Sequence, residues 1–213
     1  MPSFEPREIG FLSTRKPFVS ERLPVTLAGR RCLIFSVQDG AIGTRSGQPL
    51  VAAVLAKIHE QLERSGHLIR RLPADRLDWT TPLAGACPPS LLMGHLLDCV
   101  AGICAVLAAA EPEQLAHFDE LRKLRVNHRC GPEEAIDRLR LYGAHIDEGF
   151  ALLTDADLSR RLATVFVETG ESILTLLLGN LEHLINHKHQ LFIYLKLMGV
   201  DVDSRDLYQF RGK

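Results

Sequence analysis

The stretch EHLINHKHQLFIYLKLMG, residues 182–199, decides the fold that we expect for this chain of 213 residues. It is the second half of a helix predicted from about Glu171 to Met198, and Gly199 is a typical residue just beyond a helix C-terminus. Two histidines in it, His183 and His187, lie four residues apart, so they differ by about 40° around the axis and share one face. Two ligands from one helix do not complete a metal site, so a third would come from another helix.

Three further helices are predicted before this one. Apolar residues recur at steps of three and four in the segments 49–72, about 90–110 and 132–153. Ser90 is the candidate N-cap of the second helix, and Pro132 suits the first turn of the third. A short helical segment is expected near Glu113–Leu124. Because four amphipathic helices bury their apolar stripes best against each other, we predict an all-α four-helix bundle over residues 49–200.

The two ends of the chain lie outside the predicted bundle. Residues 1–48 are rich in proline and glycine and contain one β-like run, Cys32–Val37, shortly before Asp39 and Gly40. An irregular arm or a small β-hairpin is therefore expected there. Residues 201–213 form a C-terminal tail.

Charge and cysteine content restrict the function. The chain has 25 basic and 26 acidic residues, a net charge of -1 and a sequence pI of about 6.8. This balance lacks the positive field with which a protein collects nucleic-acid phosphates. Five cysteines without a disulfide-like spacing, and an N-terminus without a signal-peptide pattern, predict a protein of the reducing cytoplasm.

A membrane-spanning helix is the alternative interpretation of Leu91–Ala110, which is twenty residues long and almost entirely apolar. His95 and Asp98 interrupt it, and ionisable groups are costly inside a bilayer. Burial inside a helical bundle explains the segment without that cost, so we expect no membrane contact.

His95 is the candidate third metal ligand, because it lies in the middle of this apolar helix. A satisfied core histidine is the alternative, and the residues alone leave both interpretations open. His189 is displaced by about 200° from His187 and points away from the pair. The remaining histidines lack a partner at ligand spacing, and surface or capping roles are expected for His59, His67, His117, His128 and His145.

Three neighbours of these histidines have candidate roles. Asp98 lies one turn after His95 and could accept its second imidazole N–H, or be a buried polar residue satisfied by another helix. Cys99 could be a soft ligand or a small packing residue. Gln190 returns to the face of His183 and could orient a ligand or a water molecule.

Two segments resemble the DinB/YfiT-like superfamily of metal-binding helical bundles. They are Ser90–Leu96, preceded by Trp79, and Glu182–Gly199. In that superfamily a serine stands a few residues before a histidine in the second helix. The fourth helix contains two histidines separated by three residues, then a glutamine after two more residues, and it ends with the pattern Tyr-Leu-x-x-x-Gly. His189 departs from the pattern, since glycine is usual at its position. The resemblance covers about residues 50–200.

The resemblance implies an up-down-down-up four-helix bundle, often a homodimer. It also implies a divalent metal ion held by His95, His183 and His187. Imidazole ligands suit zinc or nickel and do not separate the two metals. The residues 1–48 and 201–213 fall outside the match and are candidates for dimer contacts or a lid.

Two classes of function are compatible with such a site. The first is a metal-dependent enzyme acting on a small molecule, either a transferase that uses a low-molecular-weight thiol or a hydrolase. The second is a non-catalytic, stress-related metal-binding or scaffold protein. An open coordination position would favour the enzyme, whereas closure by a fourth ligand such as Cys99 would favour the second class. No residue is identified as a general base.

Overall fold

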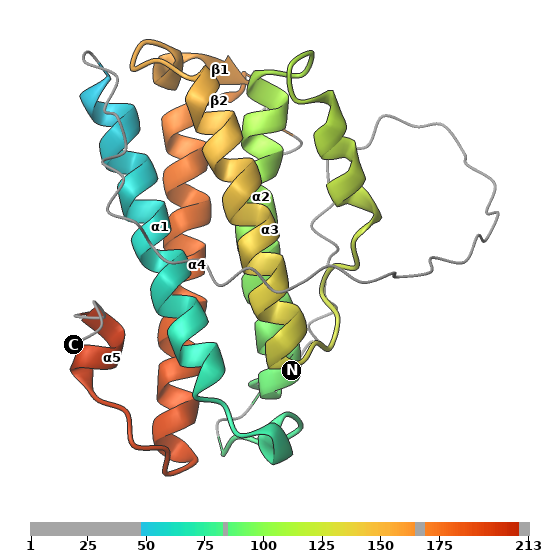
Figure 1. Ribbon diagram of the computed structural model, residues 1–213, viewed down its shortest axis with the longest axis vertical. Helices are drawn as coiled ribbons and strands as arrows, with labels where there is room; N and C mark the ends of the chain where they lie inside the picture. The colour runs from blue at the N-terminus through green and yellow to red at the C-terminus, as the bar shows by residue number, and fades with distance from the viewer. Residues whose placement is uncertain (1–47, 83–84, 165–168, 209–213) are drawn as a thin grey trace, which may run out of the picture. The chain divides into compact units, whose positions relative to one another are not determined.

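Four long helices form a bundle in the computed structural model, which describes residues 48–82, 85–164 and 169–208 (Figure 1). The helices are α1 (Pro49–Arg70), α2 (Pro89–Ala110), α3 (Pro132–Leu152) and α4 (Ile173–Leu197). Their positions agree with the four helices predicted from apolar periodicity. The arm or hairpin predicted for residues 1–48 lies, apart from Gln48, outside the described residues.

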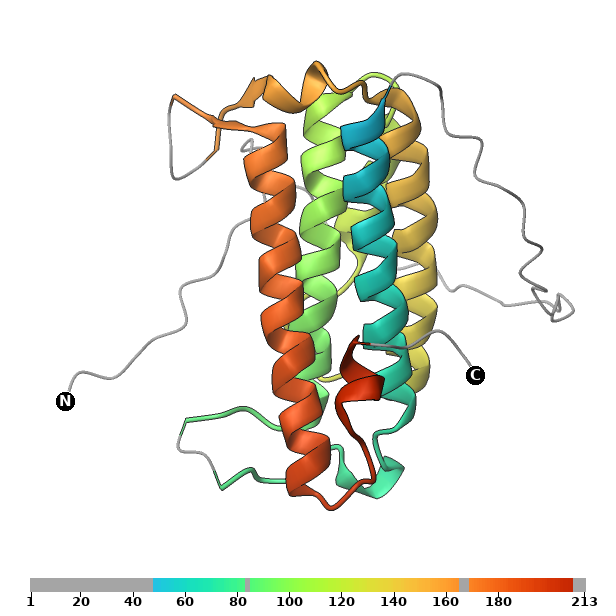
Figure 2. The ribbon, with the colours of Figure 1, turned by 90° about the vertical axis from the view of Figure 1, so that its left-hand side faces the viewer.

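The helices run up-down-down-up, as the resemblance implied (Figures 1 and 2). Helix α2 packs against α3 and α4, and α1 packs against the same two helices. Helices α2 and α3 are parallel, so the chain between them must return along the length of the bundle. It does so through the 3-10 helix η2 (Ala116–Lys123), where the sequence predicted a short helical segment.

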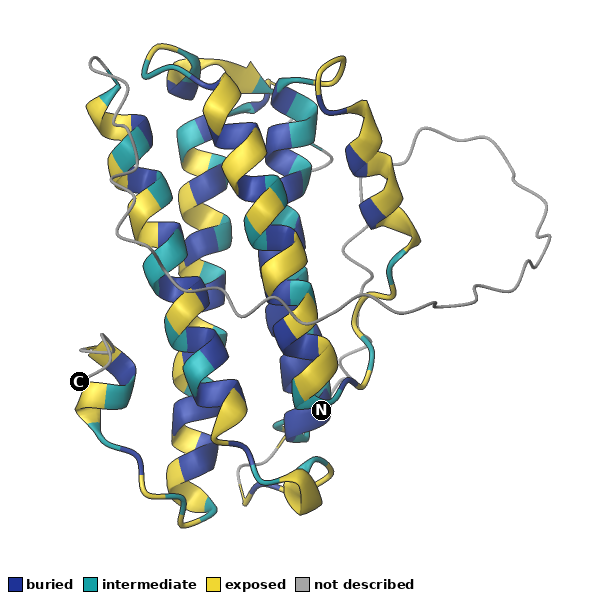
Figure 3. Cartoon of the chain, in the orientation of Figure 1, coloured by how far each residue is buried: buried dark blue, intermediate teal, exposed yellow. Residues whose placement is uncertain are grey.

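Helix α2 is the most deeply buried of the four (Figure 3). Among the described residues it is the one helix long and apolar enough to cross a membrane, and 67% of its most apolar window is buried within the protein. Packing against α3 and α4 therefore accounts for its apolar surface. This favours a buried core helix over a membrane-spanning one.

The helix starts differ slightly from the prediction. Helix α2 begins at Pro89 with Pro88 as its N-cap, so the prediction of Ser90 as N-cap is wrong. The physical reason is that proline fits the first turn, where its missing N–H is not needed. The Ser90 hydroxyl instead donates a hydrogen bond to Asp78 (3.1 Å).

Helix α4 has a capping residue at each end. The Ser172 hydroxyl accepts a hydrogen bond from the Thr175 N–H (3.0 Å), which starts the helix at Ile173. At the other end Gly199 has a φ of +79°, as expected of the residue after a helix C-terminus. These caps set the two ends of the helix that carries His183 and His187.

Several short elements complete the described chain. The 3-10 helix η1 (Ala74–Arg76) follows α1, and η3 (Asp157–Ser159) follows α3. Strands β1 (Arg161–Leu162) and β2 (Glu171–Ser172) pair antiparallel before α4, a hairpin that the sequence analysis did not predict because each strand is only two residues long.

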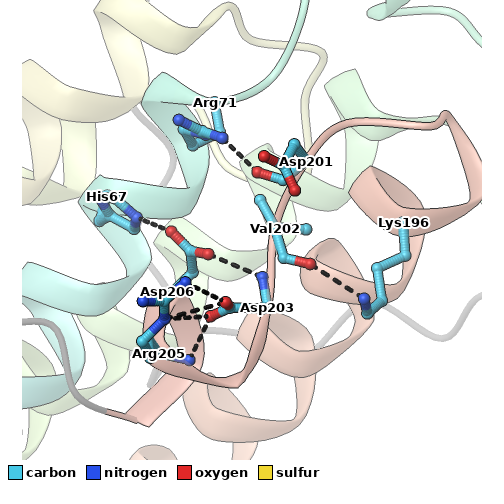
Figure 4. Close-up of polar contacts among 8 residues, drawn as sticks. All are labelled: His67, Arg71, Lys196, Asp201, Val202, Asp203, Arg205 and Asp206. Atoms are coloured by element: carbon cyan, nitrogen blue, oxygen red, sulfur yellow. Dashed lines mark hydrogen bonds and ion pairs between the residues drawn. The ribbon is translucent and has the colours of Figure 1, made fainter.

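The C-terminal tail contains a short helix, α5 (Ser204–Tyr208), which packs on α1. Figure 4 shows the polar contacts that hold it, and we call them the C-terminal clasp. His67 of α1 bonds the Asp206 carboxylate (2.6 Å), Arg71 donates to the Asp201 carbonyl, and Lys196 of α4 donates to the Val202 carbonyl (2.9 Å). The tail is thus attached to two helices of the bundle.

Candidate metal centre

Three histidines meet between α2 and α4. His95 comes from α2, and His183 and His187 come from successive turns of α4. The ring centroids of His95 lie 5.1 Å from His183 and 4.5 Å from His187, and the α4 pair is 4.6 Å apart. One ring nitrogen from each residue lies within 4.8 Å of the others. The cluster can therefore hold a metal ion, and in the described part of the chain it is the one group of its kind.

Close approach of α2 and α4 brings the rings together. A Cβ atom at Gly102 of α2 would lie 2.1 Å from the Asn180 amide oxygen of α4, so the Asn180 side chain packs directly on the α2 backbone at this point. The predicted i, i+4 spacing then directs both histidines of α4 toward His95. All three side chains are partly buried.

A hydrogen-bond relay orients His187. The Cys87 carbonyl accepts from the Tyr194 hydroxyl (2.9 Å), which accepts from the Gln190 amide nitrogen (2.9 Å), and the Gln190 oxygen lies 3.1 Å from His187 Nδ1. Because a carbonyl oxygen can only accept, the Tyr194 hydroxyl donates its proton to Cys87 and accepts from the Gln190 amide nitrogen. The Gln190 oxygen then faces His187 and can only accept, so the proton lies on His187 Nδ1. His187 Nε2 is then the unprotonated nitrogen. Gln190 therefore has the orienting role that its position on the helix predicted.

The partner of His95 differs from the prediction. Asp98 was a candidate acceptor for the second N–H of His95, but its carboxylate lies 3.9 Å from His95 Nδ1, beyond hydrogen-bond distance. The Asn127 amide oxygen accepts from His95 Nδ1 instead (2.9 Å), and Asp98 accepts from the Asn127 backbone N–H (2.8 Å). Asp98 thus holds the backbone of Asn127, a residue that the sequence analysis missed, and its charge acts on His95 from 3.9 Å.

The three imidazoles have different pKa shifts. Asp98 raises the pKa of His95, with burial of the ring opposing it. Burial lowers the pKa of His183, and so does the nearby His95. Burial also lowers the pKa of His187. The two rings of α4 therefore favour the neutral form, which is the form that binds metals.

Cys99 is not placed as a fourth ligand. Its thiol lies 3.4 Å from the His95 carbonyl of its own helix, and the side chain is buried. Burial, and to a lesser extent Asp98, raise the pKa of this thiol to about 12. Its alternative interpretation, a small packing residue, fits these observations.

The other histidines lie apart from the cluster. His189 is exposed and contacts the Phe192 ring edge-on, as its position on the helix predicted. Four others each contact a carboxylate, and these pairs are His59 with Asp147, His67 with Asp206, His117 with Glu148 and His128 with Glu134. These contacts with carboxylates account for the four histidines without a metal.

A hollow of about 380 Å³ lies at the start of α2. Asp78, Thr80, Ala86, Pro88 and Arg129 line it. Cys87, whose carbonyl ends the His187 relay, stands in the chain between two of these lining residues. The relay therefore connects His187 to the loop segment that contributes Ala86 and Pro88 to this hollow.

Comparisons with known proteins identify the fold. Neither a family model nor a curated protein matches the sequence. Among solved structures, the DinB-like protein YjoA from Bacillus subtilis is 17% identical with a TM-score of 0.53, over 69% of this chain and 92% of that one. A protein described as a DinB family member, from Exiguobacterium sibiricum 255-15, is 20% identical with a TM-score of 0.50, over 74% of this chain and 97% of that one. The chain therefore has the four-helix fold of the DinB-like proteins.

Proposed function

We propose that this chain is a DinB-family metalloenzyme in which His95, His183 and His187 bind zinc or nickel. The convergence of three imidazole nitrogens within 4.8 Å, from two helices, is the observation that carries the proposal. The donor set fits these metals, because imidazole suits zinc and nickel, whereas magnesium and calcium prefer oxygen ligands. The described residues place no carboxylate or thiol in the cluster.

The surrounding residues prepare the imidazoles for this role. The relay through Gln190 and Tyr194 holds the proton of His187 on Nδ1, and Asn127 accepts the proton of His95 on the same ring atom. In both rings Nε2 is left to bind a metal, and the ring cannot rotate without breaking a hydrogen bond. A bound divalent ion supplies a Lewis acid that lowers the pKa of a thiol or water ligand.

An enzyme is favoured over a closed structural site. Closure would need a fourth protein ligand, and Cys99 is buried with its thiol against a backbone carbonyl. The partial burial of the three histidines leaves access for a small molecule, and the hollow at the start of α2 is the candidate position for its remainder. We propose a low-molecular-weight thiol as co-substrate in a transfer reaction, with hydrolysis as the second possibility.

The same proposal includes the setting of the enzyme. We propose a soluble, cytoplasmic homodimer that binds neither nucleic acid nor membrane. The balanced charge supports the absence of a nucleic-acid partner. The burial of α2 within the bundle supports a soluble protein, and the four described cysteines are free, as expected in a reducing compartment.

Metal analysis of matched variants tests the site. Each protein is incubated with zinc or nickel and then desalted. We expect the wild type to retain about one metal ion per chain, and His183→Ala to retain less than about 0.1 metal ion per chain. His189→Ala is the control, because it removes an exposed histidine of the same helix and should bind as the wild type does. Equal metal content in all three proteins would overturn the site.

A thermal-shift screen with thiols tests the enzyme proposal. A co-substrate that binds the metal-loaded protein raises its Tm by mass action and should not raise that of His183→Ala. If low-molecular-weight thiols shift both proteins equally or neither, the thiol part of the proposal is wrong. Hydrolysis at the same site and the non-catalytic metal-binding or scaffold protein are then the interpretations that stay.

A further inference from the structure

Asn127 has an unusual backbone conformation beside the histidine cluster. Its φ is +46°, and among the described residues it is the one non-glycine residue with positive φ. Asparagine tolerates this left-handed region better than most residues, but the conformation is still unfavourable for a side chain. Contacts with the rest of the protein must therefore hold the linker between η2 and α3 in place.

Helix α2 provides these contacts. The Asp98 carboxylate accepts from the Asn127 N–H (2.8 Å), and three residues later the Cys130 N–H donates to the Ser90 carbonyl (3.2 Å). Between these two points the linker lies directly on the helix, because a Cβ atom at Gly94 would lie 1.9 Å from the His128 carbonyl oxygen. The backbone of Asn127 is thus fixed relative to the turn of α2 that carries His95.

With its backbone held in this way, Asn127 places its side-chain amide oxygen next to the His95 ring. The Asn127 amide oxygen lies 2.9 Å from His95 Nδ1. An amide oxygen has lone pairs and no hydrogen, so the ring nitrogen must be the donor. In the absence of this acceptor, a neutral imidazole would be free to carry its proton on either nitrogen.

We propose that Asn127 is a positioning residue that holds His95 in the tautomer protonated at Nδ1, so that Nε2 is left for the metal. This inference rests on the metal site proposed above. Asp98 supports the same function indirectly, by holding the Asn127 backbone. Hydrogen bonds of this kind to metal-binding histidines typically change metal affinity by about 10- to 100-fold.

Three variants test whether Asn127 sets the tautomer of His95 or only holds the linker against α2. Asn127→Gly keeps the left-handed backbone without strain and removes the acceptor. Asn127→Asp keeps an acceptor oxygen and should restore the function. Val126→Ala alters the exposed neighbouring side chain and is the matched control. Circular dichroism shows whether each variant is folded.

The first measurement is the tautomer of His95 in the metal-free protein, by long-range proton–nitrogen-15 NMR at alkaline pH. We expect Nδ1 to carry the proton in the wild type, Asn127→Asp and Val126→Ala. In Asn127→Gly we expect a shift toward the Nε2-protonated form. The same tautomer in Asn127→Gly as in the wild type would overturn the proposal.

The second measurement is zinc affinity by competition with a chelator. We expect the Kd of Asn127→Gly to rise by about 10- to 100-fold, and those of Asn127→Asp and Val126→Ala to stay within about threefold of the wild type. An unchanged Kd in Asn127→Gly contradicts the positioning role. If the wild type itself binds no zinc, the proposed metal site fails, while the tautomer measurement still reports on Asn127.

Discussion

Tyr194 links the histidine cluster to the loop before α2, and its hydroxyl sets the direction of the relay. Replacing Tyr194 with phenylalanine leaves the Gln190 amide free to rotate, so His187 Nδ1 loses its defined acceptor. We expect the zinc Kd of Tyr194→Phe to rise by about tenfold, measured by chelator competition. Tyr142→Phe is the control, since Tyr142 is an equally buried tyrosine of α3. A similar zinc Kd for both variants would show that the relay does not act on the metal site.

Lys188 lies between the two histidines of the HKH sequence, yet it is only 2% exposed. Its ammonium donates to the Gln61 amide oxygen of α1 (2.7 Å), and burial lowers its pKa to about 8. Gln61→Leu removes this acceptor and should lower the free energy of unfolding by about 1–3 kcal/mol. Lys188→Met removes the buried charge at similar volume and should change it by less than about 1 kcal/mol. Urea unfolding measures both, and a larger loss for Lys188→Met would contradict this interpretation.

At the scale of elements, the contact between α2 and the linker 124–131 depends on Gly94. A methyl group there would collide with the backbone at His128, which cannot move as a flexible side chain could. We expect Gly94→Ala to lower the free energy of unfolding by about 1–3 kcal/mol and to weaken zinc binding by displacing Asn127.

Gly179→Ala is the matched control for Gly94→Ala. Gly179 also lies inside a helix, but a Cβ atom there would meet no atom within 4 Å. Alanine should therefore stabilise the protein by about 0.5–1 kcal/mol through its higher helix propensity. Unfolding and zinc titrations on both variants give the comparison. Stabilisation by Gly94→Ala would mean that the linker does not lie on α2 as described.

The C-terminal clasp has a pH dependence with a definite sign. Burial raises the pKa of Asp206, but hydrogen bonds from the Asp203 N–H and from His67 outweigh it, and the net pKa is lowered. A lowered carboxyl pKa contributes stability above the unfolded value of about 3.9, and this contribution is lost as the pH falls through the lower folded value. At pH 7, Asp206→Asn should therefore lower Tm by about 2–4 °C.

As the pH falls from about 3.9 through the lower folded pKa of Asp206, the difference between Asp206→Asn and the wild type should shrink toward zero, because the wild-type carboxyl then becomes protonated. Asp201→Asn is the control, since Asp201 contacts Arg71 through its backbone carbonyl. Thermal melts across this pH range measure the effect. A Tm difference that persists at low pH would mean that Asp206 acts through packing and not through its charge.

The elements differ in how far the sequence predicted them. The four long helices and the His183–His187 pair were predictable because both follow from local spacing along one helix. Asn127 was not, because its partners His95 and Asp98 lie about thirty residues earlier and the linker has no periodic pattern. Ser90 was misassigned because a serine after two prolines resembles an N-cap, whereas its hydroxyl bonds Asp78 in a loop folded back on the helix.

At the scale of the whole molecule, a metal at this site would join α2 to α4, and of the other two helices α3 packs against α2 and α1 packs against α4. A ligand that binds only the folded chain stabilises it by about 2.7 kcal/mol when its concentration is 100 times its Kd. For a chain of this size that corresponds to a Tm increase of about 5–10 °C, which a chelator should reverse. His183→Ala should show no such increase, and an equal increase in that variant would indicate binding elsewhere.

Hydrogen exchange then distinguishes local from global stabilisation. If the bundle unfolds as one cooperative unit, zinc should slow the most protected amides of all four helices, because these exchange only when the whole bundle opens. Slowing confined to the turns of α2 and α4 around His95, His183 and His187 would instead mean that the site opens by itself. We expect the global result, because the helix that carries His95 is also the most buried element of the core.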